Sequence, residues 1–107
     1  MNDMDKPTLD LVERRIRVLD SNRNIFVGKA ETQHRWLKSS EKTFRQDSSD
    51  SSNALNIARH AGELAIAVAK IEAYNEAMLS LNEIFKSLGG RALPHGVKLT
   101  VKPKYKR

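Results

Sequence analysis

A chain of 107 residues is long enough for one domain with a modest core and too short for two. Aromatic residues make up only 6% of it, so a core has to be built mainly from Leu, Ile, Val and Ala. The absence of cysteine excludes a disulfide framework, a thiol nucleophile and a cysteine zinc site, which fits a reducing compartment.

Neither a secretory signal nor a membrane span is predicted. The first ten residues, MNDMDKPTLD, are acidic and lack the apolar stretch of a secretory signal. The longest uninterrupted apolar run, residues 64–69, is far shorter than the roughly 20 residues that a membrane-spanning helix needs. We therefore expect a cytoplasmic protein that does not enter a membrane.

The net charge of +6 belongs to the end of the chain. Residues 91–107 contain six basic residues and no acidic one, so residues 1–90 carry equal numbers of both. Positive charge concentrated in one segment is typical of contacts with acidic proteins or with nucleic acid. The basic residues are Arg91, Lys98, Lys102, Lys104, Lys106 and Arg107.

Residues 8–38 are predicted to form the first helix. Apolar residues recur there at three- and four-residue steps and make one narrow apolar face, which Arg23 and Gln33 interrupt. The polar cluster at residues 20–24 competes for backbone hydrogen bonds and favours a break, but the apolar spacing keeps its phase across it. We therefore expect a continuous helix. Its face consists of Leu9, Val12, Ile16, Leu19, Phe26, Ala30 and Leu37.

A polar loop at residues 39–51 leads into a second predicted helix at residues 52–88. This helix has no proline, and Gly89-Gly90 follows it, where glycine permits a left-handed cap. Two neighbouring apolar stripes run along it, so more than one neighbour should cover its middle. The first stripe is Ile57, Ala61, Leu64, Val68, Ile71, Met78 and Phe85; the second is Leu55, Gly62, Ile66, Ala69, Ala73, Ala77, Leu81, Ile84 and Leu88.

These features predict an all-α fold. Two long helices joined by a polar loop form an antiparallel hairpin over residues 1–90, followed by an extended basic tail at residues 91–107. One chain of this size can hardly cover both stripes, so we expect two hairpins to dimerise into a four-helix arrangement. The expected oligomer interface is Leu55, Ile66, Ala69, Ala73, Leu81, Ile84 and Leu88.

In the tail the apolar period changes from 3.6 to 2. Val97, Leu99 and Val101 alternate with polar residues, as in a strand with one apolar and one basic face. No second strand is evident, so we expect the strand to pair with its copy in another subunit or with a partner's sheet edge, or to stay disordered until a partner arrives. The predicted partner-binding residues are Arg91, Val97, Lys98, Leu99, Val101, Lys102, Lys104, Tyr105, Lys106 and Arg107.

No catalytic, cofactor or metal site is predicted. His60 and Glu63 share a helix face, but they are a single pair in the reverse order of a bundle metal site, so we interpret them as a polar seam. Glu72 and Glu76 lie one turn apart, and we interpret them as a solvated face rather than an acid/base pair. No glycine-rich phosphate loop or hydrolase signature is present.

Two further positions have two interpretations each. Asn75 and Asn82 lie on the first apolar stripe, where they either fix the register of a coiled coil or reach solvent as the stripe drifts around the helix. Trp36, near the end of the first predicted helix and flanked by Arg35 and Lys38, either anchors an interface or caps the bundle. The cap is the favoured interpretation.

The segment Leu81-Asn82-Glu-Ile-Phe-Lys-Ser-Leu88-Gly89, followed by Pro94, resembles the end of the last helix of the TraM-type quorum-sensing antiactivators. These are small two-helix proteins that dimerise and bind a transcription activator. The resemblance covers under a tenth of the chain, and the long second helix and basic tail depart from the family's pattern. It implies that this architecture suits a regulatory binding protein, and no functional residue is carried over.

Together these patterns predict a non-enzymatic binding or regulatory protein without a cofactor. Apolar helix faces would form a homodimer, and the C-terminal segment would engage a protein partner by strand addition or by charge. The alternative is a nucleic-acid-binding protein whose basic tail contacts the phosphate backbone, with Tyr105 as a single stacking platform. Charge alone does not separate the two.

Overall fold

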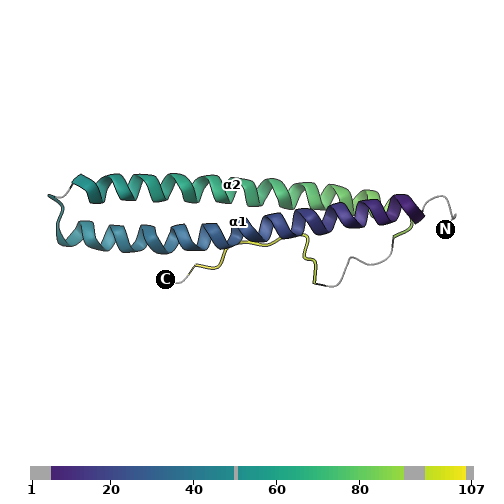
Figure 1. The fold of residues 1–107 in the computed structure, drawn as a ribbon, viewed down its shortest axis with the longest axis horizontal. Helices are drawn as coiled ribbons and strands as arrows, with labels where there is room; N and C mark the ends of the chain where they lie inside the picture. The colour runs from purple at the N-terminus through teal and green to yellow at the C-terminus, as the bar shows by residue number, and fades with distance from the viewer. Residues whose placement is uncertain (1–5, 50, 91–95, 106–107) are drawn as a thin grey trace.

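The fold is a two-helix antiparallel hairpin (Figure 1). The computed structural model describes residues 6–49, 51–90 and 96–105. Helix α1 spans Lys6–Gln46 and helix α2 spans Ser51–Ser87, and the molecule as a whole is a rod of 69 × 19 × 15 Å. The predicted all-α hairpin is confirmed. Within the described ranges, no helix is long and apolar enough to cross a membrane.

Helix α1 is longer than predicted. It is continuous through residues 20–24, as expected, but it also includes residues 39–46, which were assigned to the loop. Thr43 Oγ1 donates a hydrogen bond of 3.1 Å to the carbonyl oxygen of Ser39 one turn earlier, so polar side chains are satisfied inside the helix. The helix ends where the Asp47 carboxylate accepts a 3.2 Å hydrogen bond from the backbone N–H of Ser49. The described part of the connection, residues 47–49, therefore turns directly after α1.

Two core clusters hold the helices together. The buried residues of α1 recur every seven positions, which is the repeat of a helix that keeps one face toward its neighbour. In α2, Ile71, Met78 and Phe85 belong to the first predicted stripe, so that stripe faces α1. The open-end cluster lies at the end of the hairpin opposite the connecting loop and consists of Leu9, Ile16, Met78 and Phe85. The central cluster consists of Ala30, Ala67 and Ile71.

The end of α2 confirms the predicted glycine cap. Gly89 has φ of 93°, and its N–H donates to the carbonyl oxygen of Lys86 at 3.0 Å. The N–H of Gly90 donates to the carbonyl oxygen of Phe85 at 2.9 Å, which completes a Schellman motif. A Cβ atom at Gly90 would overlap the Phe85 ring, so this close approach also requires glycine.

Candidate functional site

Residues 96–105, here called the docked tail, run in extended form along the hairpin (Figure 1). Burial alternates with a period of two: Val97, Leu99 and Val101 are half-buried, whereas Lys98 and Lys102 are exposed. Val97 and Leu99 pack against the open-end cluster. The apolar and basic faces were therefore predicted correctly, and the apolar face is covered by the chain's own helices.

Asn75 of α2 holds the docked tail as a neighbouring strand would. Its Nδ2 donates to the carbonyl oxygen of Val101 at 3.1 Å, and its Oδ1 accepts from the N–H of Val101 at 3.3 Å. The side-chain amide thus satisfies both backbone groups of one residue. The interpretation that Asn75 reaches solvent is wrong, because its amide is engaged with the tail. Asn82 is buried.

Arg23 of α1 is the second anchor and is only 1% exposed. Its Nη1 donates to the carbonyl oxygen of Lys98 at 2.6 Å and to Asn75 Oδ1 at 3.1 Å, while Nη2 pairs with Asp20 Oδ1 at 2.5 Å. Burial lowers the pKa of Arg23, and the Asp20 carboxylate opposes that shift. A guanidinium keeps its charge even so, and the Asp20 pair compensates it.

The far end of the docked tail meets polar residues of α1. The N–H of Lys104 donates to Glu31 Oε1 at 2.9 Å, and the Tyr105 ring stacks on His34 with ring centroids 4.2 Å apart. Burial raises the pKa of Tyr105, with the Glu31 carboxylate as the second cause. These contacts border a hollow of about 380 Å³ that Arg35 and Lys38 also line.

One expectation for the tail was wrong. Because no second strand was evident, the segment was expected to pair with another chain or to stay disordered, yet residues 96–105 pack on their own hairpin. No strand occurs among the described residues. The physical reason is that side chains of Arg23, Glu31 and Asn75 replace the missing strand edge. The sequence signal that indicates this docking is a polar residue at a position where the helix spacing predicts an apolar one. Arg23 and Asn75 both occupy such positions.

The predicted partner-binding residues therefore divide into two sets. Those that point toward the helices are Val97, Leu99 and Val101, and those exposed on the docked tail are Lys98, Lys102, Lys104 and Tyr105. Arg91, Lys106 and Arg107 lie outside the described residues. The tail thus presents lysines outward while its backbone and apolar side chains are already engaged.

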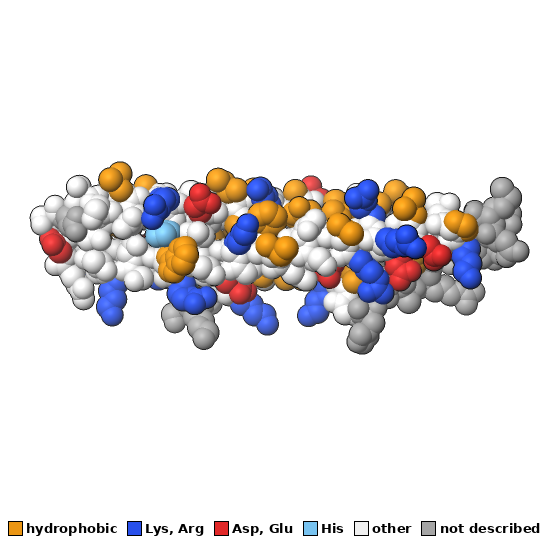
Figure 2. Space-filling model, in the orientation of Figure 1, with side chains coloured by type: hydrophobic (Ala, Val, Ile, Leu, Met, Phe, Trp, Pro, Cys, Tyr) orange, Lys and Arg blue, Asp and Glu red, His pale blue; other side chains and the backbone are white. Residues whose placement is uncertain are grey.

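Away from the tail, large apolar side chains lie exposed along both helices (Figure 2). In α1 the residues Leu11, Val18 and Ile25 follow the buried positions at a constant offset of two, so they share one side. In α2 a similar seven-residue repeat relates Ile66 to Ala73. We call this surface the open face; it consists of Leu11, Val18, Ile25, Trp36, Ile66, Ala73, Ala77 and Ile84.

The predicted oligomer interface lies largely on exposed surface. Leu55, Ile66, Ala69, Ala73 and Ile84 are exposed. Leu81 and Leu88 are half-buried and pack against the open-end cluster of their own chain. The second stripe of α2 is thus left mostly uncovered by the hairpin.

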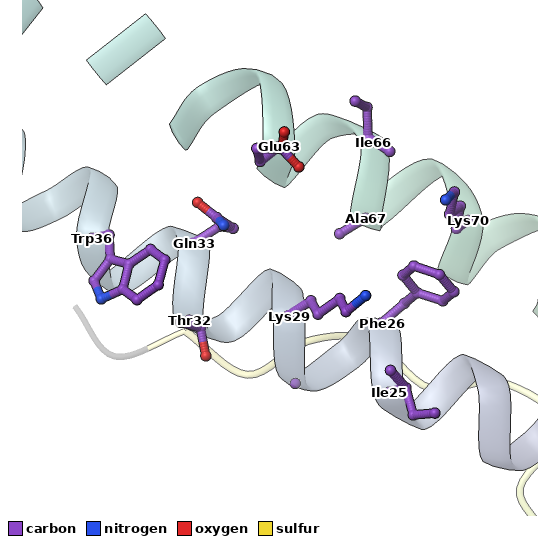
Figure 3. A pocket seen from close by; sticks show the side chains of 11 residues that line it. Ile25, Phe26, Lys29, Thr32, Gln33, Trp36, Glu63, Ile66, Ala67 and Lys70 are labelled. Carbon is purple, nitrogen blue, oxygen red and sulfur yellow. The ribbon is translucent and has the colours of Figure 1, made fainter. Parts of the chain in front are cut away.

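A groove of about 640 Å³ crosses the open face between the helices (Figure 3). Ile25 and Ile66 line it and are 56% and 53% exposed, and Trp36 stands at one end, 49% exposed. Viewed from the groove, the yellow tail passes behind α1 (Figure 3). The groove and the docked tail therefore occupy different sides of the hairpin.

Two lysines flank one aromatic ring in this groove. Lys29 Nζ lies 5.0 Å and Lys70 Nζ 4.7 Å from the centroid of the Phe26 ring. Phe26 in turn stacks on Tyr74 with centroids 5.9 Å apart. The electron-rich face of the ring attracts each ammonium group, so a basic rim is fixed beside an apolar floor.

The predicted polar seam around His60 lies at the edge of the groove. His60 Nδ1 is 2.8 Å from Gln33 Oε1, and its ring is tilted against Trp36 at 5.5 Å. Trp36 does not cap the bundle, because α1 continues to Gln46 and half of the indole is exposed. Among the residues that the structure describes, no three His, Cys, Asp or Glu side chains gather as a metal site.

Comparison of the chain with known proteins and structures found no match. The chain matches no protein-family model, no curated protein and no solved structure. The function is therefore argued from the arrangement of the residues themselves.

Proposed function

We propose that this protein is a non-enzymatic binding or regulatory protein of the cytoplasm that docks onto a protein partner. The observation that carries the proposal is the open face, where large apolar side chains of both helices remain exposed. Contiguous exposed apolar surface is typical of protein interaction sites. The docked tail supports the same function, because its lysines face outward beside the hairpin.

The open face suits docking by helix packing. Ala73 and Ala77 are small and exposed, so another helix can approach α2 closely at these positions. Aromatic and aliphatic anchors at the centre of such a surface usually provide most of the binding energy. The proposed homodimer, a four-helix arrangement of two hairpins, would use this surface, and so would a different helical protein.

Association of the purified protein tests this proposal. Light scattering over a concentration series, with the wild type compared with the double variant Ile25→Asp, Ile66→Asp, measures self-association through the open face. Leu79→Asp serves as the control, since Leu79 is exposed outside the open face. The proposal fails if association with itself or with a partner is the same in the double variant, while thermal melting shows that both variants are folded.

Nucleic-acid binding is the second candidate, and the outward row of Lys98, Lys102 and Lys104 favours it. The exposed Tyr105 ring adjoins the hollow lined by Arg35 and Lys38, which offers a base a stacking surface near positive charge. Phosphate contacts release counterions, so the affinity would fall steeply with salt. Fluorescence anisotropy with single-stranded DNA at two salt concentrations tests this candidate, and a Lys→Gln change at all three lysines should abolish binding.

A further inference from the structure

The charge pattern of the open face is one-sided. Following α1 in steps of four and three from Leu11 gives Arg15, Val18, Asn22, Ile25, Lys29, Thr32 and Trp36. The same steps along α2 pass Arg59, Ile66 and Lys70, with Glu63 as the acidic residue of the groove. Apolar side chains thus alternate with four cations, and the groove has one carboxylate.

The two groove cations have no anionic partner within the part of the chain that the structure describes. The ion pairs there are Arg17 with Glu13 and Arg23 with Asp20, and neither includes Lys29 or Lys70. Both ammonium groups lie within 5.0 Å of one ring centroid, so they repel each other as well as binding the ring. An added carboxylate beside these ammonium groups would relieve that repulsion.

We infer that the partner of the open face is an acidic amphipathic helix of another protein, with its apolar stripe on Ile25 and Ile66 and with carboxylates that pair with Lys29 and Lys70. This inference rests on the proposed function and names the chemistry of its partner. Complementary charge at the rim of an apolar groove selects the partner and its orientation.

A second copy of this chain fits the same surface less well. It would bring its own Arg15, Lys29, Arg59 and Lys70 toward an identical set, and like charges brought together across an interface oppose association. An anionic membrane surface would satisfy the charge but not the shape, because the site is a groove between two helices with Ala67 at its floor. A convex helix fills such a groove.

Two synthetic peptides test the inference with the full-length protein. The open face from Leu11 to Trp36 is about 38 Å long, which matches a helix of about 25 residues. Both peptides carry leucine at the heptad a and d positions; one has glutamate and the other lysine at the flanking positions. A separate control peptide has the composition of the acidic peptide in scrambled order. Isothermal titration calorimetry measures each affinity.

The acidic heptad peptide is expected to bind, and the double variant Lys29→Gln, Lys70→Gln to weaken it by about tenfold, since partly exposed charge pairs contribute modestly. Lys38→Gln with Lys42→Gln removes the same charge from exposed positions of α1 outside the open-face spacing, and should change the affinity by less than about twofold.

Several outcomes overturn the inference while leaving the proposed function intact. They are equal binding of the lysine peptide, equal binding of the scrambled peptide, equal weakening by the control variant, and self-association that excludes the acidic peptide. Binding to anionic phospholipid vesicles that depends on Lys29 and Lys70, without peptide binding, also overturns it. If no peptide binds and Ile25→Asp with Ile66→Asp changes no association, the proposed function fails as well.

Discussion

Replacing Asn75 with alanine should release the docked tail while leaving the hairpin folded. The side-chain amide of Asn75 makes both hydrogen bonds of Val101, at 3.1 and 3.3 Å, and alanine can make neither. Alanine also favours the helix, so α2 itself should not suffer. The change also removes the hydrogen bond that Arg23 Nη1 donates to Asn75 Oδ1 between the two helices, so thermal melting has to measure the cost to the hairpin separately from the attachment of the tail.

The size of the effect follows from those two bonds. Each hydrogen bond contributes a net free energy of about 1 kcal/mol, so losing both destabilises the attached tail by about 2 kcal/mol. That energy corresponds to a roughly 30-fold increase in the detached population relative to the attached one. The Arg23 hydrogen bond to the carbonyl of Lys98 remains and limits the opening to the segment near Val101.

Amide hydrogen exchange measured by NMR reports this population residue by residue. The N–H of Val101 should exchange about 30-fold faster in the variant, whereas the amide of Ile71 in the central cluster should be unaffected. Glu76→Ala, at the exposed neighbouring position, is the control and should leave Val101 unchanged. Unaltered exchange at Val101 in Asn75→Ala would refute the idea that Asn75 holds the tail.

Three further predictions concern single contacts. Arg23→Met should lower the free energy of unfolding in urea by about 2 to 3 kcal/mol, because it leaves the Asp20 carboxylate without its cation; a change below about 0.5 kcal/mol would contradict this. Gly89→Ala should cost about 1 kcal/mol in thermal unfolding, since φ of 93° strains any other L-residue, and an unchanged melting temperature would count against it. The raised pKa of Tyr105 favours the neutral phenol in the docked state, so docking is intact below pH 10.0 and weakens as the pH rises through the raised value. The NMR chemical shifts of Tyr105 and His34, measured as a function of pH, follow this loss of docking. Tyr105→Phe should remove the pH dependence.

The sequence by itself determined the two helices and the end of α2. Apolar residues at three- and four-residue steps specify the continuity of α1 across its polar cluster and the face of α2 that packs on it, because helix periodicity is a local property. Gly89 specifies the cap for the same local reason. The alternation of Val97, Leu99 and Val101 likewise predicted which side of the tail is apolar.

The tertiary structure alone decided where the tail lies and which stripe stays open. Arg23 was only an interruption of an apolar face in the sequence, and its partners Asn75 and Lys98 are 52 and 75 positions away. Periodicity carries no information on such distances, because it records neighbours along one helix and not across two. The tail covers the side of the hairpin that carries Arg23 and Asn75. The side that carries Ile25 and Ile66 stays exposed.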